Sequence, residues 1–235
     1  MRLGAFAFTP RPVPTLAAAV LTALTAFLGS WQADRVGEKS QRQALLEARS
    51  LEPRVDLTGA VSSADSLLFR RVRARGEYVA GGQIFIDNRI HGGRAGFHVV
   101  TPLALSAGGA VILVNRGWVA RSRAYPAAPE VPVPAGEQLV EGLATVPPAR
   151  VLELSAETVS GNVWQNLAIP RYAARSKVPV LPVVILAPPA PGLAAVDENP
   201  DAGVAKHREY SLTWYSLAAT LVALWIGLNL RRAPR

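Results

Sequence analysis

The chain has no cysteine, and this absence excludes several kinds of chemistry. Disulfides, thiolate metal sites, covalent attachment of c-type haem and thiol redox reactions all require that residue. Catalytic signatures are missing too, because the sequence has no G-x-S-x-G, H-E-x-x-H, P-loop or Rossmann glycine pattern. The three histidines, His91, His98 and His207, are widely separated. The sequence therefore predicts neither an enzyme nor a structural zinc site.

Acidic residues are fewer than basic ones, and the formal net charge is +8. A nucleic-acid-binding surface would carry such charge on the folded domain. Here five arginines account for most of the excess, and they lie before the first long apolar run or after the last: Arg2, Arg11, Arg231, Arg232 and Arg235. The distribution indicates basic tails and predicts no nucleic-acid partner.

Two long apolar runs stand out in a chain of which half the residues are apolar. The first, Val13–Leu28, is short for a membrane span and is followed by Trp31, an aromatic residue suited to the membrane interface. The second, Ser211–Leu230, has no charge and would be about 30 Å long as a helix. A cleavable signal peptide is the alternative for the first run, and a buried core helix for the second. We predict transmembrane helices at 13–31 and 207–230.

The basic ends determine the expected topology. Under the positive-inside rule the tails 1–12 and 231–235 both lie in the cytoplasm, so the segment 32–206 is extracytoplasmic. The dozen residues before the first run are too few for a mitochondrial transit peptide. We therefore expect a multi-pass protein of the bacterial inner (cell) membrane, in contact with membrane lipid.

The segment between the two runs changes from helical to strand patterning. Gln32–Arg49 is rich in helix formers, and Pro53 ends that character. Short runs of Val, Ile and Phe separated by Gly-rich turns follow. The predicted strands are Val55–Val61, Phe69–Val79, Gln83–Asn88, Phe97–Leu105, Val111–Asn115 and Gln138–Thr145. The expected fold class is a membrane protein of α+β type, in which two transmembrane helices flank an extracytoplasmic antiparallel β-rich domain, built as a sheet or a barrel.

Prolines mark two further segments. Four prolines within Tyr125–Pro134 remove ladder hydrogen bonds, which predicts an extended surface connection. Val178–Leu186 is β-rich, and its two prolines, Pro179 and Pro182, predict an edge strand or a bulge. We interpret Asp197–Asp201 as part of the return to the membrane.

His207 lies four residues before the second apolar run. If the helix extends back through it, His207, Tyr210, Ser211 and Trp214 share one helical face. A neutral imidazole beside aromatic rings is a candidate axial ligand for haem iron, and the basic residues next to it are candidate partners for haem propionates. Alternatively, these side chains only anchor the helix at the membrane interface.

The four residues Asn115, Arg116, Gly117 and Trp118 combine turn formers with an aromatic ring. We interpret them as a strand end entering a tight turn, in which Arg116 and Trp118 stack. This pattern favours a rigid structural corner, and a role in partner binding stays open.

The features above form an ordered series along nearly the whole chain. Its members are Gly29-Ser30-Trp31-Gln32, Arg35, Lys39, Arg75-Gly76-Glu77-Tyr78, Asn88-Arg89, Gly96, Val100-Thr101-Pro102-Leu103, Val114-Asn115-Arg116-Gly117-Trp118-Val119, Trp164-Gln165-Asn166, Asn199-Pro200, His207, Tyr210 and Thr213-Trp214-Tyr215. The series resembles the Surfeit-locus family of cytochrome c oxidase assembly factors. One departure is that the family histidine follows the Asn-Pro pair almost directly, whereas residues 201–206 intervene here.

The resemblance implies a biogenesis factor that assists insertion or stabilisation of haem a while the catalytic subunit of cytochrome c oxidase matures. It implies transient binding of haem a at His207, through the iron, with Tyr210 and Trp214 beside it. Trp31 and Gln32, like the segment from Asn115 to Trp118, are expected to bind a partner or support the fold. The implied partners are the oxidase catalytic subunit and the haem a synthase.

Two other interpretations stay open. A non-haem membrane scaffold would hold oxidase subunits together during assembly. A membrane-anchored envelope enzyme would have to use Asp87, Glu77 and His98, although these residues follow no catalytic spacing.

Overall fold

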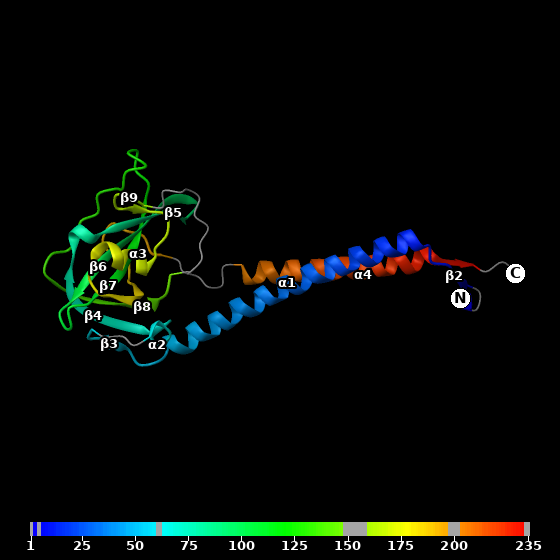
Figure 1. Cartoon of the computed structure of the whole chain (residues 1–235), viewed down its shortest axis with the longest axis horizontal. Coiled ribbons are helices and arrows are strands. Elements are labelled where there is room, and N and C mark those ends of the chain that lie inside the picture. Colours follow the sequence, from blue (N-terminus) through cyan, green and yellow to red (C-terminus); the bar gives the residue numbers. More distant parts are fainter. Residues whose placement is uncertain (1, 4–5, 60–62, 148–158, 197–202, 233–235) are drawn as a thin grey trace. The chain divides into compact units, whose positions relative to one another are not determined.

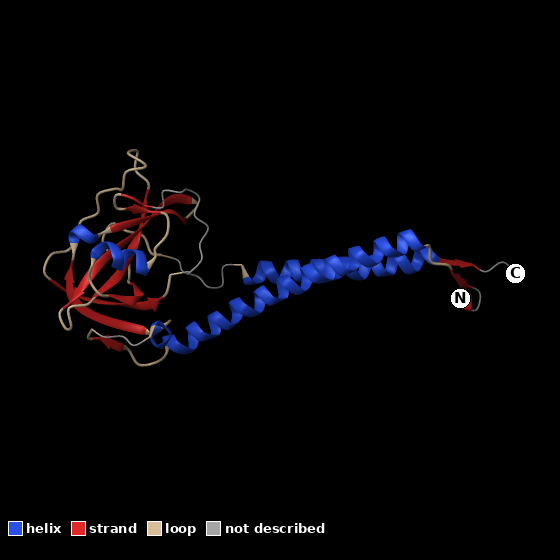
Figure 2. Cartoon of the chain, viewed as in Figure 1, coloured by secondary structure: helices blue, strands red, loops and turns tan. Residues whose placement is uncertain are grey.

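The computed structural model describes residues 2–3, 6–59, 63–147, 159–196 and 203–232. The chain forms two compact units, an end unit of Met1–Ala44 with Asn199–Arg235 and a central domain of Leu45–Glu198. The fold is of the predicted α+β type, with a long apolar helix toward each end and a β-rich middle (Figures 1 and 2). The Asn199-Pro200 pair and the predicted return segment Asp197–Asp201 lie outside the described residues.

Two long helices make up most of the end unit, α1 (Pro12–Ser50) and α4 (Val204–Asn229). Both are long and apolar enough to cross a membrane. The predicted membrane helix and the predicted solvated helix Gln32–Arg49 are parts of one continuous element, α1. No helix breaker lies between them, and the residues after Trp31 are good helix formers.

The contact between α1 and α4 combines hydrogen bonds with a small residue. Ser211 Oγ donates to the carbonyl of Gly29 at 3.0 Å, and Trp225 Nε1–H donates to Thr15 Oγ1 at 3.1 Å. These contacts pair later positions of α1 with earlier positions of α4, so the helices are antiparallel (Figure 1). A Cβ at Gly29 would lie 3.0 Å from the ring of Tyr215, so glycine permits the close approach.

A small antiparallel sheet joins the two chain ends. Its order is β1 (Arg2–Leu3), β2 (Phe6–Phe8) and β12 (Leu230–Arg232), and β12 follows α4 directly. The sequence predicted basic tails here and no strands. Two- and three-residue strands are too short to show a periodic pattern, so the sheet could not be read from the sequence.

The central domain is a barrel with an extension. The nine-stranded sheet has the order β3-β4-β8-β11-β7-β6-β5-β10-β9, and β4 also pairs with β6, which closes β4, β8, β11, β7 and β6 into a ring. The elements are β3 (Val55–Leu57), α2 (Ala64–Leu67), β4 (Arg71–Tyr78), the 3₁₀ helix η1 (Ala80–Gly82), β5 (Ile84–His91), β6 (Arg94–Leu105), β7 (Val111–Ala120), β8 (Glu137–Thr145), β9 (Val159–Ser160), β10 (Val163–Trp164), α3 (Ile169–Ser176) and β11 (Val180–Leu186).

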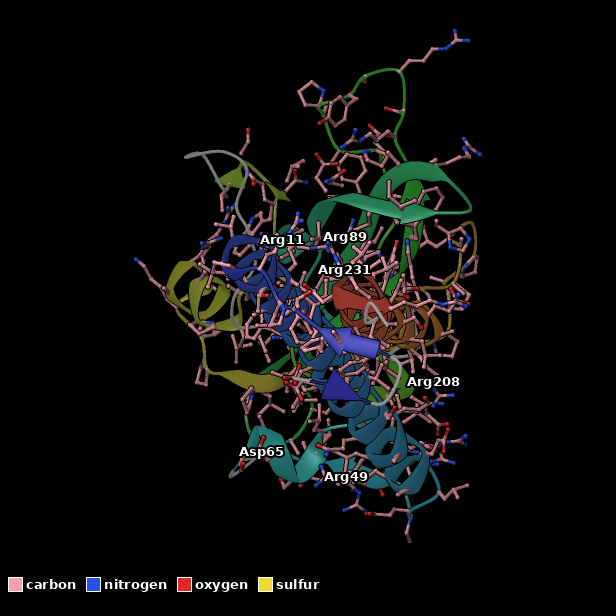
Figure 3. The ribbon with its side chains drawn as sticks, turned by 90° about the vertical axis from the view of Figure 1, so that its right-hand side faces the viewer. Arg11, Arg49, Asp65, Arg89, Arg208 and Arg231 are labelled. Carbon is pink, nitrogen blue, oxygen red and sulfur yellow. The ribbon has the colours of Figure 1, made fainter. Side chains whose placement is uncertain are left out.

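Inward-facing aliphatic side chains fill this barrel. Val72, Leu103, Ile112 and Val183 are fully buried there, and each such side chain stabilises the fold by about 1.5–3 kcal/mol. A second cluster surrounds Trp164 under α3. The last turns of α1 belong to this unit, because the Arg49 guanidinium donates to the carbonyls of Asp65 and Leu68 at 2.6 and 2.9 Å (Figure 3).

Two expectations about the sheet are wrong. It is mixed, since β3–β4, β5–β10 and β7–β11 are parallel pairs. β11 is not an edge strand but lies between β7 and β8. The alternative for Val178–Leu186, a bulge, is confirmed by a register shift between Val180 and Val184, where Pro182 has no N–H to offer the ladder.

Candidate functional site

His207 lies in the first turn of α4, where its backbone N–H donates to the carbonyl of Gly203 at 2.9 Å. Its ring nitrogen Nδ1 is 2.6 Å from Oε1 of Gln32 on α1. Because an amide oxygen only accepts, Nδ1 carries the hydrogen in this contact. In the neutral ring the lone pair then lies on Nε2. The contact therefore holds the imidazole in one orientation and one tautomer.

The residue beside this ring is a glycine. Gly203 has φ +104°, in the left-handed region that favours glycine. A Cβ there would lie 3.9 Å from Nε2 of His207 and 3.3 Å from Nζ of Lys39. The Lys39 ammonium group and the His207 ring therefore both lie close to Gly203.

The two aromatic residues predicted to accompany His207 differ in position. His207, Ser211 and Trp214 are all at least partly buried on the face of α4 toward α1. Their spacing of four and three residues follows the contact stripe of a paired helix. Tyr210 is not brought to that face: it is 47 % exposed, and Nζ of Lys206 lies 6.0 Å from the centre of its ring.

The neighbouring residues Trp31 and Gln32 of α1 also point in different directions. Gln32 is partly buried and reaches His207, whereas Trp31 is 44 % exposed. The Arg35 guanidinium lies 5.8 Å from the Trp31 ring and bonds the Glu38 carboxylate at 2.7 Å. Gln32 is therefore the member of this pair that positions the histidine.

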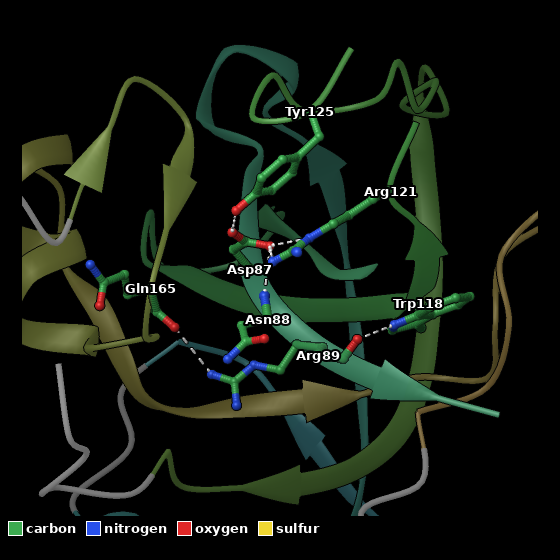
Figure 4. Close-up of polar contacts among 7 residues, drawn as sticks. All are labelled: Asp87, Asn88, Arg89, Trp118, Arg121, Tyr125 and Gln165. Carbon is green, nitrogen blue, oxygen red and sulfur yellow. Dashed lines mark hydrogen bonds and ion pairs between the residues drawn. The ribbon is translucent and has the colours of Figure 1, made fainter. Parts of the chain in front are cut away.

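Several residues that carry the family resemblance meet in the central domain, although they are far apart in the sequence (Figure 4). Nε1–H of Trp118 on β7 donates to the carbonyl of Arg89 on β5 at 2.8 Å. The Arg89 guanidinium donates to the carbonyl of Gln165 at 3.4 Å and to Oδ1 of Asn166 at 3.3 Å, just after β10. These bonds join three parts of the sheet and support its shape.

The residues from Asn115 to Trp118 form a β-bulge, and the predicted strand end with a tight turn is wrong. β7 continues to Ala120, and at this point it has one residue more than its partner β6. Gly117 has φ +134°, and Oδ1 of Asn115 accepts from its N–H at 3.2 Å. The Asn and Gly that suggested a turn therefore build the bulge instead.

Arg116 and Trp118 do not stack on each other as expected. The Arg116 guanidinium lies 5.3 Å from the Tyr78 ring and donates to Oε1 of Gln83 at 3.1 Å. The Trp118 ring lies 5.1 Å from that of His91. The extra residue of the bulge changes the alternation of side chains, so the two no longer share a face. Burial raises the pKa of the Tyr78 hydroxyl, which stays neutral beneath the arginine.

The polar residues considered for an enzyme, Asp87, Glu77 and His98, are not brought together. The Asp87 carboxylate accepts from the Arg121 guanidinium at 2.8 Å and from the Tyr125 hydroxyl at 3.2 Å (Figure 4). Burial is the main cause that lowers the pKa of His98 to about 4. Within the described ranges, no hydrogen bond or ion pair joins any two of the three.

Sequence reasoning named Gln32 and His207 separately and did not pair them. They are 175 positions apart, and only the packing of α1 on α4 brings them together. One signal was available, because both lie just outside an apolar run on the side predicted to be extracytoplasmic. Nothing in the sequence indicated that Gly203 would lie beside the His207 ring.

Fold and site together define a class of protein: a barrel domain between two long apolar helices, with a histidine held by hydrogen bonding between those helices. A sequence profile of the SURF1 family matches residues 19–219. The chain therefore belongs to the SURF1 family.

Relatives align along most of the chain. Surfeit locus protein 1 of Mus musculus is 27 % identical over 231 residues, which cover 92 % of this chain and 76 % of the relative. The SURF1-like protein of Monosiga brevicollis is 28 % identical over 221 residues, covering 88 % and 84 %. The SURF1-like protein of Rickettsia felis is 25 % identical over 215 residues, covering 85 % and 89 %. Proteins of bacteria and of eukaryotes thus align with most of this chain.

Proposed function

We propose that this SURF1-family protein is a biogenesis factor of the bacterial inner membrane, which assists insertion or stabilisation of haem a as the cytochrome c oxidase catalytic subunit matures. Both apolar helices cross the membrane, both termini are cytoplasmic, and the central domain is extracytoplasmic. The family membership and the two helices support this assignment. The oxidase catalytic subunit and the haem a synthase are the proposed partners.

The contact between His207 and Gln32 carries the haem part of the proposal. Histidines that ligate metals commonly donate their second ring N–H to a fixed acceptor, which orients the ring. Here Nδ1 meets Gln32 at 2.6 Å, so Nε2 is the atom that would bind haem iron. Bound haem a would supply the iron and two propionates.

The test is a complemented deletion strain, in which the reduced-minus-oxidised spectrum of membranes is recorded together with total haem a. We expect His207→Ala to weaken the aa3-type band while haem a is still made. Gln32→Ala should lower the haem affinity of the purified protein by roughly 10- to 100-fold, because the ring loses its orienting partner. Gln41→Ala, at an exposed position of the same helix, is the matched control and should behave as wild type.

A normal band with His207→Ala would overturn haem handling. The scaffold would then be the better assignment, provided that the variant still captures the oxidase catalytic subunit. One observation favours that second candidate: Arg89, Trp118 and Gln165 form their hydrogen-bond network in the central domain, whereas His207 belongs to the end unit.

A further inference from the structure

A groove of about 570 Å³ lies between the beginning of α1 and the end of α4. This volume is within the range of small-molecule sites, roughly 300–1,000 Å³. Its walls are mainly apolar and include Leu21, Leu221 and Leu224. Two arginines, Arg11 and Arg231, line the same groove from the two chain ends (Figure 3). The groove therefore combines an apolar wall with two cations.

Arg11 and Arg231 have no neutralising partner among the described residues. In the part of the chain that the structure describes, their guanidinium groups make no hydrogen bond or ion pair. The sequence has no aspartate or glutamate before Asp34 or after Glu209, so none is near in sequence at this end. The positive end of the α1 dipole and the negative end of the α4 dipole lie together here and oppose each other. Arg11 and Arg231 are the charged side chains among the residues that line the groove.

The groove is built into the fold. Trp225, one of its lining residues, donates from Nε1 to Thr15 Oγ1 at 3.1 Å, and its ring meets the Phe8 ring edge-to-face at 5.3 Å. Arg231 belongs to β12 and pairs with Ala7 of β2, which fixes its backbone beside the groove. Contacts within the fold therefore hold both Trp225 in the wall and the backbone of Arg231.

From this geometry we infer that the groove binds an anionic phospholipid of the cytoplasmic leaflet. The headgroup phosphate lies between Arg11 and Arg231, and an acyl chain follows the leucines of the wall. Phosphatidylcholine also has a phosphate, but its choline cation cancels the net charge, so the two arginines select an anionic headgroup. The inference rests on the membrane insertion of α1 and α4 in the proposed function.

The test uses the full-length protein in phosphatidylcholine vesicles that contain a small fraction of brominated lipid, which quenches nearby tryptophans. The fluorescence lost in Trp225→Phe identifies the contribution of Trp225. We compare the mole fractions of the two brominated lipids that quench this contribution equally. We expect the mole fraction of brominated phosphatidylglycerol to be at least about fivefold lower than that of brominated phosphatidylcholine. Each arginine near an anionic lipid favours binding by roughly fivefold. Inorganic phosphate added to the buffer should not relieve the quenching.

Arg231→Gln and Arg232→Gln are a matched pair. Both remove one positive charge from β12, and adjacent strand residues point to opposite faces, so only Arg231 lines the groove. We expect Arg231→Gln, like Arg11→Gln, to reduce the preference, and Arg232→Gln to retain it. Equal losses in the matched pair, or equal quenching by both lipids in the wild type, overturn the site. If neither lipid quenches any tryptophan, the helices are not inserted and the proposed topology fails as well.

Discussion

His98, on β6, shows how the barrel controls the charge of a single residue. Burial, followed by the positive charges of Arg89 and His91, lowers its pKa to about 4. Its ring nitrogen Nδ1 lies 3.5 Å from Nδ2 of Asn115, in the bulge of β7. The ring is therefore neutral at cellular pH, and it is a structural part of the sheet.

This shift predicts a loss of stability in acid. The ordinary pKa of histidine, 6.5, applies to the unfolded chain, which binds more protons than the folded one between pH 6.5 and about 4. Stability is thus complete above pH 6.5 and falls as the pH approaches 4. We expect the free energy of unfolding to drop by about 2–3 kcal/mol across that window, measured from urea midpoints of the solubilised full chain. In His98→Gln, the free energy of unfolding should no longer fall by this amount between pH 6.5 and 4. If its dependence on pH is the same as in the wild type, His98 is not the cause.

At the scale of elements, α1 has two glycines with opposite surroundings. A Cβ at Gly29 would lie 3.0 Å from the Tyr215 ring, whereas a Cβ at Gly37 would meet nothing within 4 Å. Leucine at either position gains helix propensity of roughly 0.8 kcal/mol. We expect Gly37→Leu to raise the thermal midpoint, and Gly29→Leu to lower it by overpacking at a net cost of about 1–2 kcal/mol. Equal increases would show that α1 and α4 do not approach closely at Gly29.

The elements also show which parts of a fold are readable from one sequence. The apolar runs of α1 and α4 and the strands of the barrel are local patterns, and they were predicted with boundaries a few residues off. The position of β11 in the sheet depends on pairing with β7 and β8, which are distant in the sequence. Pro182 therefore indicated an irregular strand but not where in the sheet that strand lies. The bulge at Gly117 was misread because turns and bulges use the same residue types.

The candidate site follows the same division. His207 was identified from its place just before the second apolar run. Gln32 was named only through the family resemblance, as a residue expected to bind a partner or support the fold. Their contact at 2.6 Å depends on helix packing across 175 positions, for which one sequence has no signal. The groove at Arg11 and Arg231 was missed for the same reason, since each arginine alone resembled an ordinary flanking charge.

For the whole molecule, the proposed topology predicts the behaviour of reporter fusions. Alkaline phosphatase fused after Gly192 should be active, because the central domain is exported. The same reporter after Arg235 should be inactive, and green fluorescent protein there should fluoresce. Activity of the phosphatase after Arg235 would contradict a cytoplasmic C-terminus.

Mass spectrometry of the mature protein tests whether the first apolar run is an anchor. We expect the mature chain to keep residues 1–31, whereas their loss would identify a cleaved signal peptide.

The place of β11 in the barrel has a consequence for biosynthesis. β7 and β8 leave the ribosome well before Val180–Leu186, and each then has an open edge on the side where β11 later lies. The barrel closes only when that strand is translated, shortly before Val204 begins the second long helix. The central domain can therefore complete its folding only shortly before α4 is translated. A nascent chain stopped between β8 and β11 would present two unpaired strand edges, and these would attract chaperones or aggregate.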